Sequence, residues 1–378
     1  MQQIPHPYQT LYSELAQRSL DATFSSEFDV NGRFVHAEVK GRRYWYFDLP
    51  DGDGSKKRTY VGPVDDPEIT KRVENFKDLK ADVRERRKLV STLVRQAYLP
   101  RPERITGNIV QALAKAGFFR LRGVLVGTVA YQCYPAILGV RLPSTSMVTG
   151  DADFAQFHSI SVAVEDGMPP VLETLKAVDS TFREIPHQSD SRHATQFVSR
   201  SGYKVEFLTP NTGSDDYGGR PAPMPALGGA SAQPLRFLDY LIYQPIRAVL
   251  LHGPGVPVNI PSPERYAIHK LIVASRRRTA NNGTEKSRTD LAQAATIMEA
   301  MIEQRQSDEL ADGFMEVYDR GPSWQEAIRT SLSRIKDETR EKIQSAIAAS
   351  IRNLESDPTN YGLAETAPRL GSPDTGPI

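Results

Sequence analysis

The sequence predicts an α/β fold, with a mixed sheet flanked by helices. In the middle of the chain, short apolar runs typical of buried strands alternate with segments of helical periodicity. An aromatic and β-branched stretch punctuated by Gly and Asp precedes them, and helical patterns follow. We therefore expect a β-meander plus long helix over residues 1–100, an α/β domain over 101–260, a helical region over 261–355, and a disordered tail over 356–378.

Composition narrows the class of protein further. The 378 residues carry 47 Lys and Arg against 46 Asp and Glu, so a surface that binds nucleic acid has to be local. The single cysteine, Cys133, excludes an internal disulfide and fits a reducing compartment. No apolar run approaches the roughly 18 residues of a membrane span, and residues 1–10 lack the regions of a signal peptide. These features predict a cytoplasmic protein without a membrane partner.

The N-terminal region reads as a helix, a meander and a second helix. Residues 8–19 have the pattern of a short amphipathic helix, and the stretch from Gly32 to Pro63 that of two or three strands. Basic residues alternate there with aromatic ones, and two interpretations stay open. The face contacts nucleic acid, or the aromatic rings pack the sheet onto the next helix. The residues concerned are Arg42, Arg43, Tyr44, Trp45, Tyr46, Lys56, Lys57, Arg58 and Tyr60.

The segment from Asp66 to Gln96 predicts one long charged helix. Pro67 follows an Asp cap at the first helical position, and apolar residues recur at steps of three and four. Its apolar stripe needs a partner, either the meander or another subunit. The run from Leu99 to Pro102 contains two prolines and predicts a hinge before the α/β domain.

The stretch from Phe118 to Phe154 organises the rest of the chain. A buried-strand run ends at Val126, and Gly127 and Thr128 then begin a helix-like segment. A glycine lets a phosphate approach the backbone closely, and a threonine offers its hydroxyl and helix-turn amides. A loop then leads to Asp151 and Asp153. Because side chains two apart in a strand face the same way, the two carboxylates share one face and favour a hard divalent cation such as Mg²⁺.

A third acid lies on a later strand. Residues 193–210 read as a hairpin that turns at 200–202, and Glu206 stands between apolar neighbours on its returning strand. The acids Asp215 and Asp216 lie in a Gly-, Pro- and Ala-rich stretch, residues 215–232, that predicts a flexible loop. Residues 160–164 predict a further strand. A helix beginning near Pro263 carries Lys270 among apolar residues.

A strand, a Gly-Thr pair at a helix start, Asp-x-Asp and a lone later acid form the pattern of the nucleotidyltransferase fold. The chain resembles that superfamily over roughly residues 105–298. More narrowly, the runs VGTVAYQCYP, TGDADFAQ, GYKVEFLTP and PSPERYAIHKLIV resemble an uncharacterised bacterial family named after a Geobacter member.

The resemblance implies metal-dependent transfer of a nucleoside monophosphate from an NTP, with release of pyrophosphate. Asp151, Asp153 and Glu206 would bind Mg²⁺ or Mn²⁺, with Glu206 either a metal ligand or the general base. Most members of the superfamily carry Asp at this third position, so Glu206 is a departure. Gly127, Thr128 and Lys270 would meet the nucleotide, although Lys270 on an amphipathic helix also fits a surface lysine.

Several alternatives stay open. The residues from Pro135 to Thr149 read as an insertion that either covers the nucleotide, with Arg141 near its phosphates, or is passive. The acceptor is unspecified, and the alternatives are an RNA or tRNA end, a protein hydroxyl, a small molecule and a second nucleotide. The rival function is that of a non-catalytic nucleotide- or nucleic-acid-binding protein with the same fold.

Overall fold

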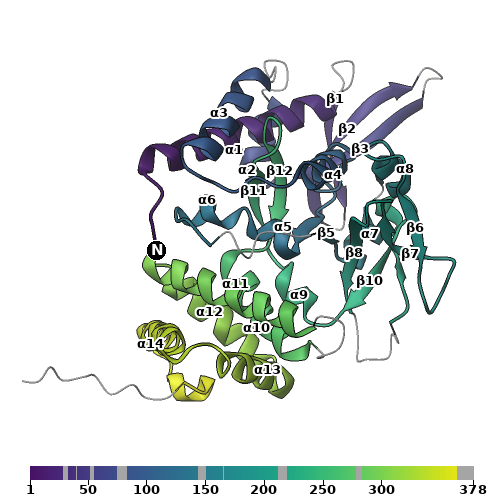
Figure 1. Cartoon of the computed structure of the whole chain (residues 1–378). Coiled ribbons are helices and arrows are strands. Elements are labelled where there is room, and N and C mark those ends of the chain that lie inside the picture. Colours follow the sequence, from purple (N-terminus) through teal and green to yellow (C-terminus); the bar gives the residue numbers. More distant parts are fainter. Residues whose placement is uncertain are drawn as a thin grey trace, which may run out of the picture. The chain divides into compact units, whose positions relative to one another are not determined.

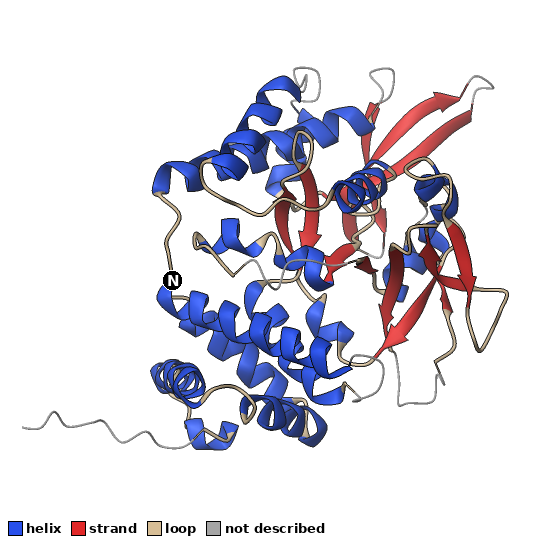
Figure 2. Ribbon diagram, viewed as in Figure 1, coloured by secondary structure: helices blue, strands red, loops and turns tan. Residues whose placement is uncertain are grey.

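The computed structural model describes residues 1–28, 33–39, 41–51, 55–74, 83–143, 150–164, 166–211, 219–277 and 283–363. The chain divides into two compact units, Met1–His269 and Lys270–Ile378, and the boundary falls inside helix α10 (Pro263–Arg276). The α/β class is confirmed, because the described strands all belong to the first unit and the described part of the second is helical (Figure 2). The division into four segments stays a prediction.

The described strands of the first unit form three sheets (Figure 1). An antiparallel meander has the order β1-β2-β3, and a central sheet has the order β4-β5-β8-β10-β9, with β7 also on β8 and β6 on β7. Strands β11 and β12 pair separately. The strands are β1 (Arg33–Val39), β2 (Arg42–Asp51), β3 (Ser55–Pro63), β4 (Val124–Val126), β5 (Asp151–Ala155), β6 (Arg183–Pro186), β7 (Ala194–Val198), β8 (Lys204–Pro210), β9 (Ala222–Pro223), β10 (Ser231–Leu235), β11 (Ile246–Leu250) and β12 (Val256–Ile260).

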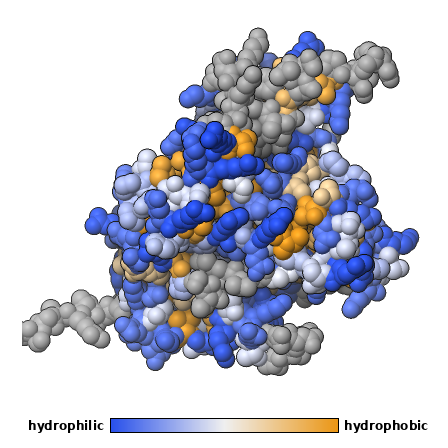
Figure 3. Space-filling model, turned by 45° about the horizontal axis from the view of Figure 1, so that its top comes forward, coloured by the Kyte–Doolittle hydropathy of each residue, from blue (hydrophilic) through white to orange (hydrophobic). Residues whose placement is uncertain are grey.

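Short and long helices surround these sheets. Before the central sheet come α1 (His6–Glu27), α2 (Pro67–Glu74), α3 (Val83–Arg95) and α4 (Arg104–Lys115). Within and after it come α5 (Gly127–Tyr131), α6 (Tyr134–Leu138), α7 (His158–Ala163), α8 (Val171–Lys176), η4 (Pro225–Leu227) and α9 (Leu238–Leu241). Figure 3 shows one face of the surface, where hydrophilic side chains predominate and hydrophobic ones form separate small patches.

The predicted meander is confirmed, and its interior favours the packing interpretation of its aromatic residues. Trp45 donates a hydrogen bond through Nε1 to Thr70 of α2 at 2.7 Å. Asp48 is buried and binds Lys56 at 2.8 Å and Arg58 at 2.7 Å. The hydrogen bond from Arg58 is the main reason that the pKa of Asp48 falls to about 2. Two of the basic groups proposed for nucleic acid therefore already hold a carboxylate.

Two described helices, α2 and α3, occupy the range predicted as one helix, and residues 75–82 between them lie outside the described residues. Ile69 of α2 packs against the meander, as one alternative predicted. Leu93 of α3 packs in a cluster with Leu15 of α1 and Val249 of β11, so α3 finds its partner inside the same unit. Helix α1 is longer than predicted. From it, the Tyr12 hydroxyl donates to Val249 O and accepts from Val249 N.

The structure corrects two elements near the central sheet. Residues 158–163 form helix α7 where a strand was predicted over 160–164, because a run of five apolar or small residues fits a helix as well as a strand. Ser161 Oγ accepts a hydrogen bond from Ala226 N. The predicted loop over 215–232 contains β9 and the start of β10, in which Ala232 is fully buried. Pairing of β10 with β8 overrides the composition. Asp215 and Asp216 lie outside the described residues.

The second unit consists of the end of α10 followed by α11 (Gly283–Glu303), α12 (Ser307–Asp319), α13 (Pro322–Leu332), α14 (Asp337–Asn353) and η5 (Pro358–Tyr361). These described helices fall within the range predicted as a helical region, residues 261–355, except that η5 lies in the predicted tail. In the described part of the chain, no helix is both long and apolar enough to cross a bilayer. Residues 364–378 of the predicted tail lie outside the described residues.

Candidate active site

Strand pairing places the predicted acids on adjoining positions. Strand β5 runs parallel to β8, with Asp153 opposite Glu206 and Asp151 opposite Lys204. Along β5 the intervening residues Ala152 and Phe154 are buried, whereas Asp151 and Asp153 are half-buried, as is Glu206. The backbone therefore presents the three carboxylates from one face of two neighbouring strands, as the period-two reading predicts.

Aromatic packing on the opposite face fixes this register. The rings of Phe154 and Phe207 stack with centroids 5.7 Å apart, and Phe118 contacts both edge-on at 5.3 and 6.0 Å. All three side chains are fully buried. A slip of one residue between β5 and β8 would expose these rings and bury the carboxylates, so the apolar face determines where the acids lie.

Gly127 brings backbone directly against one of the acids. Strand β4 is antiparallel to β5, with Val126 opposite Asp153, and Gly127 then begins α5 with φ of +67°. A Cβ at this position would lie 2.5 Å from Asp153 Oδ2. From α10, the Tyr266 hydroxyl donates to Gly127 O at 3.1 Å and holds this turn in place. The predicted Gly-Thr pair at a helix start is therefore present, and Thr128 is half-buried.

We expect Gly127→Ala to impair any activity that depends on Asp153. The new methyl group would displace the Asp153 carboxylate, and its backbone would be strained at a positive φ by about 1–2 kcal/mol. Thermal melting together with an activity assay checks this. Gly202→Ala is the matched control, because that glycine also has a positive φ (+86°) but nothing lies within 4 Å of its Cβ position. Equal loss of activity in both variants would contradict a specific role for the contact with Asp153.

Three polar neighbours of the acids were not predicted as site residues. Gln196 of β7 donates through Nε2 to Glu206 Oε1 at 2.8 Å. Lys204 is exposed and stands opposite Asp151, and its position two residues before Glu206 is the signal that places it on the same face. The Tyr203 hydroxyl donates to Thr106 Oγ1 at 2.8 Å, and its pKa is raised by burial first and further by the charges of Asp151 and Asp153.

The donor set suits a hard cation, although the described side chains do not form a ready-made metal cluster. Three carboxylates supply the oxygen ligands that Mg²⁺ and Mn²⁺ prefer. Among the described residues, no three His, Cys, Asp or Glu side chains gather closely enough to hold a metal ion. The metal site at Asp151, Asp153 and Glu206 therefore stays a prediction based on residue type and backbone position.

Lys270 has a carboxylate partner within the second unit. Its Nζ lies 2.6 Å from Asp290 Oδ1, and Arg277 binds the other oxygen of the same carboxylate. The side chains of Asp290 and Lys270 are only 3% and 12% exposed, which excludes the alternative of a surface lysine. Contact of Lys270 with a nucleotide stays a prediction.

The described part of the predicted insertion contacts the N-terminal residues. It contains α6, and Val140 forms a β-bridge with Gln3. Arg141 donates to Gln2 Oε1 at 2.9 Å and lies over the Tyr98 ring at 4.8 Å. Residues 144–149 lie outside the described residues. Arg141 thus has described partners other than a phosphate, and its predicted phosphate contact stays untested.

A half-buried Asp-x-Asp opposite a third acid, with a glycine turn against one carboxylate, is an arrangement suited to phosphoryl chemistry. The family model described as Nucleotidyltransferase matches residues 104–319, more than half of the chain. The chain therefore belongs to this nucleotidyltransferase family, and its class is that of a transferase. The match runs from α4 to α12 and includes every predicted site residue. No curated protein and no solved structure shows significant similarity to the chain.

Proposed function

We propose that the protein transfers a nucleoside monophosphate from an NTP to an acceptor hydroxyl and releases pyrophosphate. The observation that carries this is the pairing of Asp153 with Glu206 on adjoining strands, with the Gly127 backbone against the Asp153 carboxylate. In this step, an acceptor oxygen forms a bond to the α-phosphorus. The bond from that phosphorus to the oxygen bridging to the β-phosphate breaks, and the acceptor proton passes to a base.

Each residue has a defined part in this proposal. Asp151, Asp153 and Glu206 would hold Mg²⁺ or Mn²⁺, which when bound neutralises charge on the entering and leaving oxygens. Gly127 leaves room for the phosphates, and Thr128 offers them its hydroxyl. Gln196 orients Glu206 through its hydrogen bond, whether Glu206 serves as a metal ligand or as the base. Lys270 would contact the phosphates.

The acceptor belongs to one of a few chemical classes. An RNA or tRNA end, a protein hydroxyl, a small molecule or a second nucleotide would each supply the attacking oxygen. We place the reaction in the cytoplasm of a bacterium, in line with the resemblance to the Geobacter-type family. The structure of the meander weakens the rival based on nucleic-acid binding there, because Lys56 and Arg58 are held by Asp48.

The proposal is tested by pyrophosphate release from each NTP, with Mg²⁺ or Mn²⁺ and with total RNA or protein extract as acceptor. We expect release with at least one NTP, abolished by EDTA. Glu206→Gln separates the two roles of that residue. Loss of the base blocks release but keeps the rise in melting temperature with Mg²⁺ and NTP, whereas loss of a ligand weakens both. A rise in melting temperature without release from any NTP would favour the non-catalytic nucleotide-binding rival.

A further inference from the structure

A cavity of about 770 Å³ lies in the first unit, away from the acids. It is formed by β3, the first described turn of α3, the end of α4, the loop at residues 166–169 and the segment 254–257, where β12 begins. Its described lining includes a single acidic residue, Asp166, and five basic residues, namely Lys57, Arg86, Arg87, Lys115 and Arg120. Asp151, Asp153 and Glu206 do not line it.

The positive charge of this cavity is only partly compensated. Asp166 is bound by Arg120 at 2.5 Å and also accepts from the Tyr60 amide at 3.1 Å. Lys57 points to the opposite face of β3 from Lys56 and Arg58, which hold Asp48. In the part of the chain that the structure describes, Lys57, Arg87 and Lys115 are exposed and form no ion pair with a carboxylate. The lining therefore keeps an excess of positive charge.

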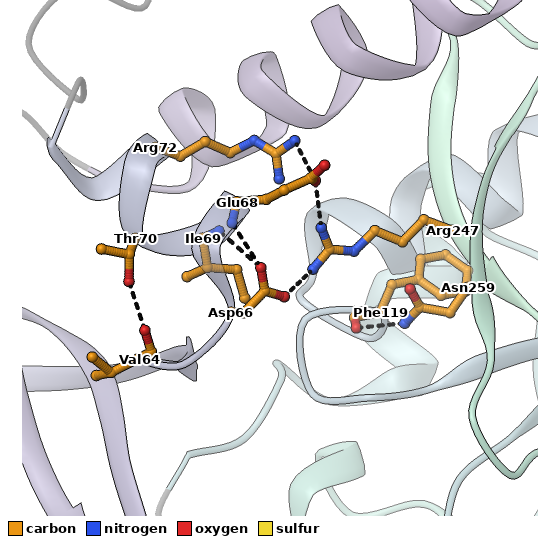
Figure 4. A network of polar contacts seen from close by, with 9 residues as sticks. All are labelled: Val64, Asp66, Glu68, Ile69, Thr70, Arg72, Phe119, Arg247 and Asn259. Carbon is orange, nitrogen blue, oxygen red and sulfur yellow. Dashed lines mark hydrogen bonds and ion pairs between the residues drawn. The ribbon is translucent and has the colours of Figure 1, made fainter.

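A neighbouring cavity of about 510 Å³ differs, because carboxylates bind an arginine of its lining on both sides of the guanidinium group. It shares Ala114, Arg120 and Pro257 with the first cavity. Figure 4 shows that Arg247 there binds Asp66 at 3.0 Å and Glu68 at 3.2 Å, and Glu68 also binds Arg72. In this second cavity Arg247 thus joins β11 to α2, whereas Arg87 and Lys115 of the larger one are exposed and form no ion pair with a described carboxylate.

The two ends of α4 separate the basic cavity from the acids. Thr106 in its first turn binds Tyr203, whose pKa responds to Asp151 and Asp153. Lys115 in its last turn lines the cavity. Nine residues of helix span about 14 Å, so a ligand in the cavity does not occupy the site of phosphoryl transfer.

We propose that this cavity binds a small phosphorylated molecule with at least two phosphate groups. Its volume lies in the range of small-molecule sites, and Arg and Lys are the side chains that bind phosphate oxygens. The described lining contains no aromatic residue. Single-stranded nucleic acid is normally held by base stacking on aromatic rings, so the lining favours a compact polyanion.

The experiment measures binding of inorganic tripolyphosphate to the full chain by calorimetry in EDTA. We expect saturable binding that Arg87→Gln weakens at least tenfold and that Arg87→Gln with Lys115→Gln abolishes. Arg84→Gln is the matched control, because Arg84 is also exposed on the same turn of α3 but lines neither cavity. Arg84→Gln should bind tripolyphosphate as wild type does, and the melting temperatures of all variants should lie within a degree or two of the wild-type value.

Three results would overturn the proposal. The first is absence of saturable binding, and the second is binding that Arg87→Gln leaves unchanged. If Asp153→Asn or Thr128→Ala alters binding and Arg87→Gln does not, the tripolyphosphate occupies the proposed nucleotide site. The third is binding of single-stranded RNA that depends on Arg87 without any binding of tripolyphosphate, which would make the surface a nucleic-acid interface.

Discussion

Asp153→Asn is expected to abolish nucleotidyl transfer and to leave the metal-free protein as stable as wild type or slightly more stable. Asp153 stands opposite Glu206 and two residues from Asp151 on the same face. Like charges held at neighbouring positions destabilise the native state, and removing one relieves that repulsion. An acid that only capped an element would behave in the opposite way, because its loss costs about 0.5–2 kcal/mol.

The measurement pairs a transfer assay with thermal melting of both proteins, in EDTA and in excess Mg²⁺ with NTP. Wild type should gain stability from metal and nucleotide by binding linkage, and the variant should gain much less. Suppose instead that the variant melts several degrees lower in EDTA and still responds to Mg²⁺ and NTP as wild type does. Asp153 would then be structural, and the proposed chemistry would be wrong.

Asp290→Asn is expected to destabilise the second unit by about 3 kcal/mol. The Asp290 side chain is 3% exposed and holds both Lys270 and Arg277. Replacing the carboxylate with an amide removes a negative charge that two cations share, one of them nearly buried, and breaking a buried pair typically costs about 3–5 kcal/mol. Arg277 is 30% exposed and keeps some hydration, which places the estimate at the lower end.

Denaturant unfolding monitored by helical circular dichroism tests this expectation. Glu285→Gln is the matched control, because Glu285 lies on the same helix, α11, and is exposed. A loss below about 0.5 kcal/mol in Asp290→Asn would show that the ion pairs contribute little. Lys270→Ala then separates two roles of the lysine. Loss of the ion pair with Asp290 lowers stability in either case, and only a phosphate contact also predicts a raised KM for NTP.

The acids were predictable because a strand has a period of two. Asp151 and Asp153 flank a buried Ala152, and Glu206 lies between Val205 and Phe207, so local spacing alone assigned all three to an outward face. That the three acids act together came only from the family resemblance, and the pairing of β5 with β8 was not predicted. Gln196 was missed, since its role depends on cross-strand register, which local spacing does not encode. Lys204 was missed although it stands two residues before Glu206, because only the register places it opposite Asp151.

Contacts between segments that are distant in the sequence account for the other differences between the predicted and the observed structure. Lys270 meets Asp290 across twenty residues, and no helical period links the two positions. The run from residue 160 to 164 satisfies a strand pattern, yet it forms α7 next to η4, where Ser161 meets the backbone of Ala226. Strand β10 forms from Gly-, Pro- and Ala-rich sequence because β8 offers it an edge.

The contact between Tyr12 and β11 bears on how the protein avoids aggregation. Val249 stands opposite Pro257, which has no amide hydrogen to donate, so the Val249 N–H and C=O point outward from the two-stranded sheet. The Tyr12 hydroxyl occupies both groups, with distances of 2.9 Å and 3.2 Å. An exposed strand edge recruits further strands from other molecules. The Tyr12 hydroxyl thus prevents another strand from pairing with β11 at Val249, and a chain lacking α1 would expose these two backbone groups.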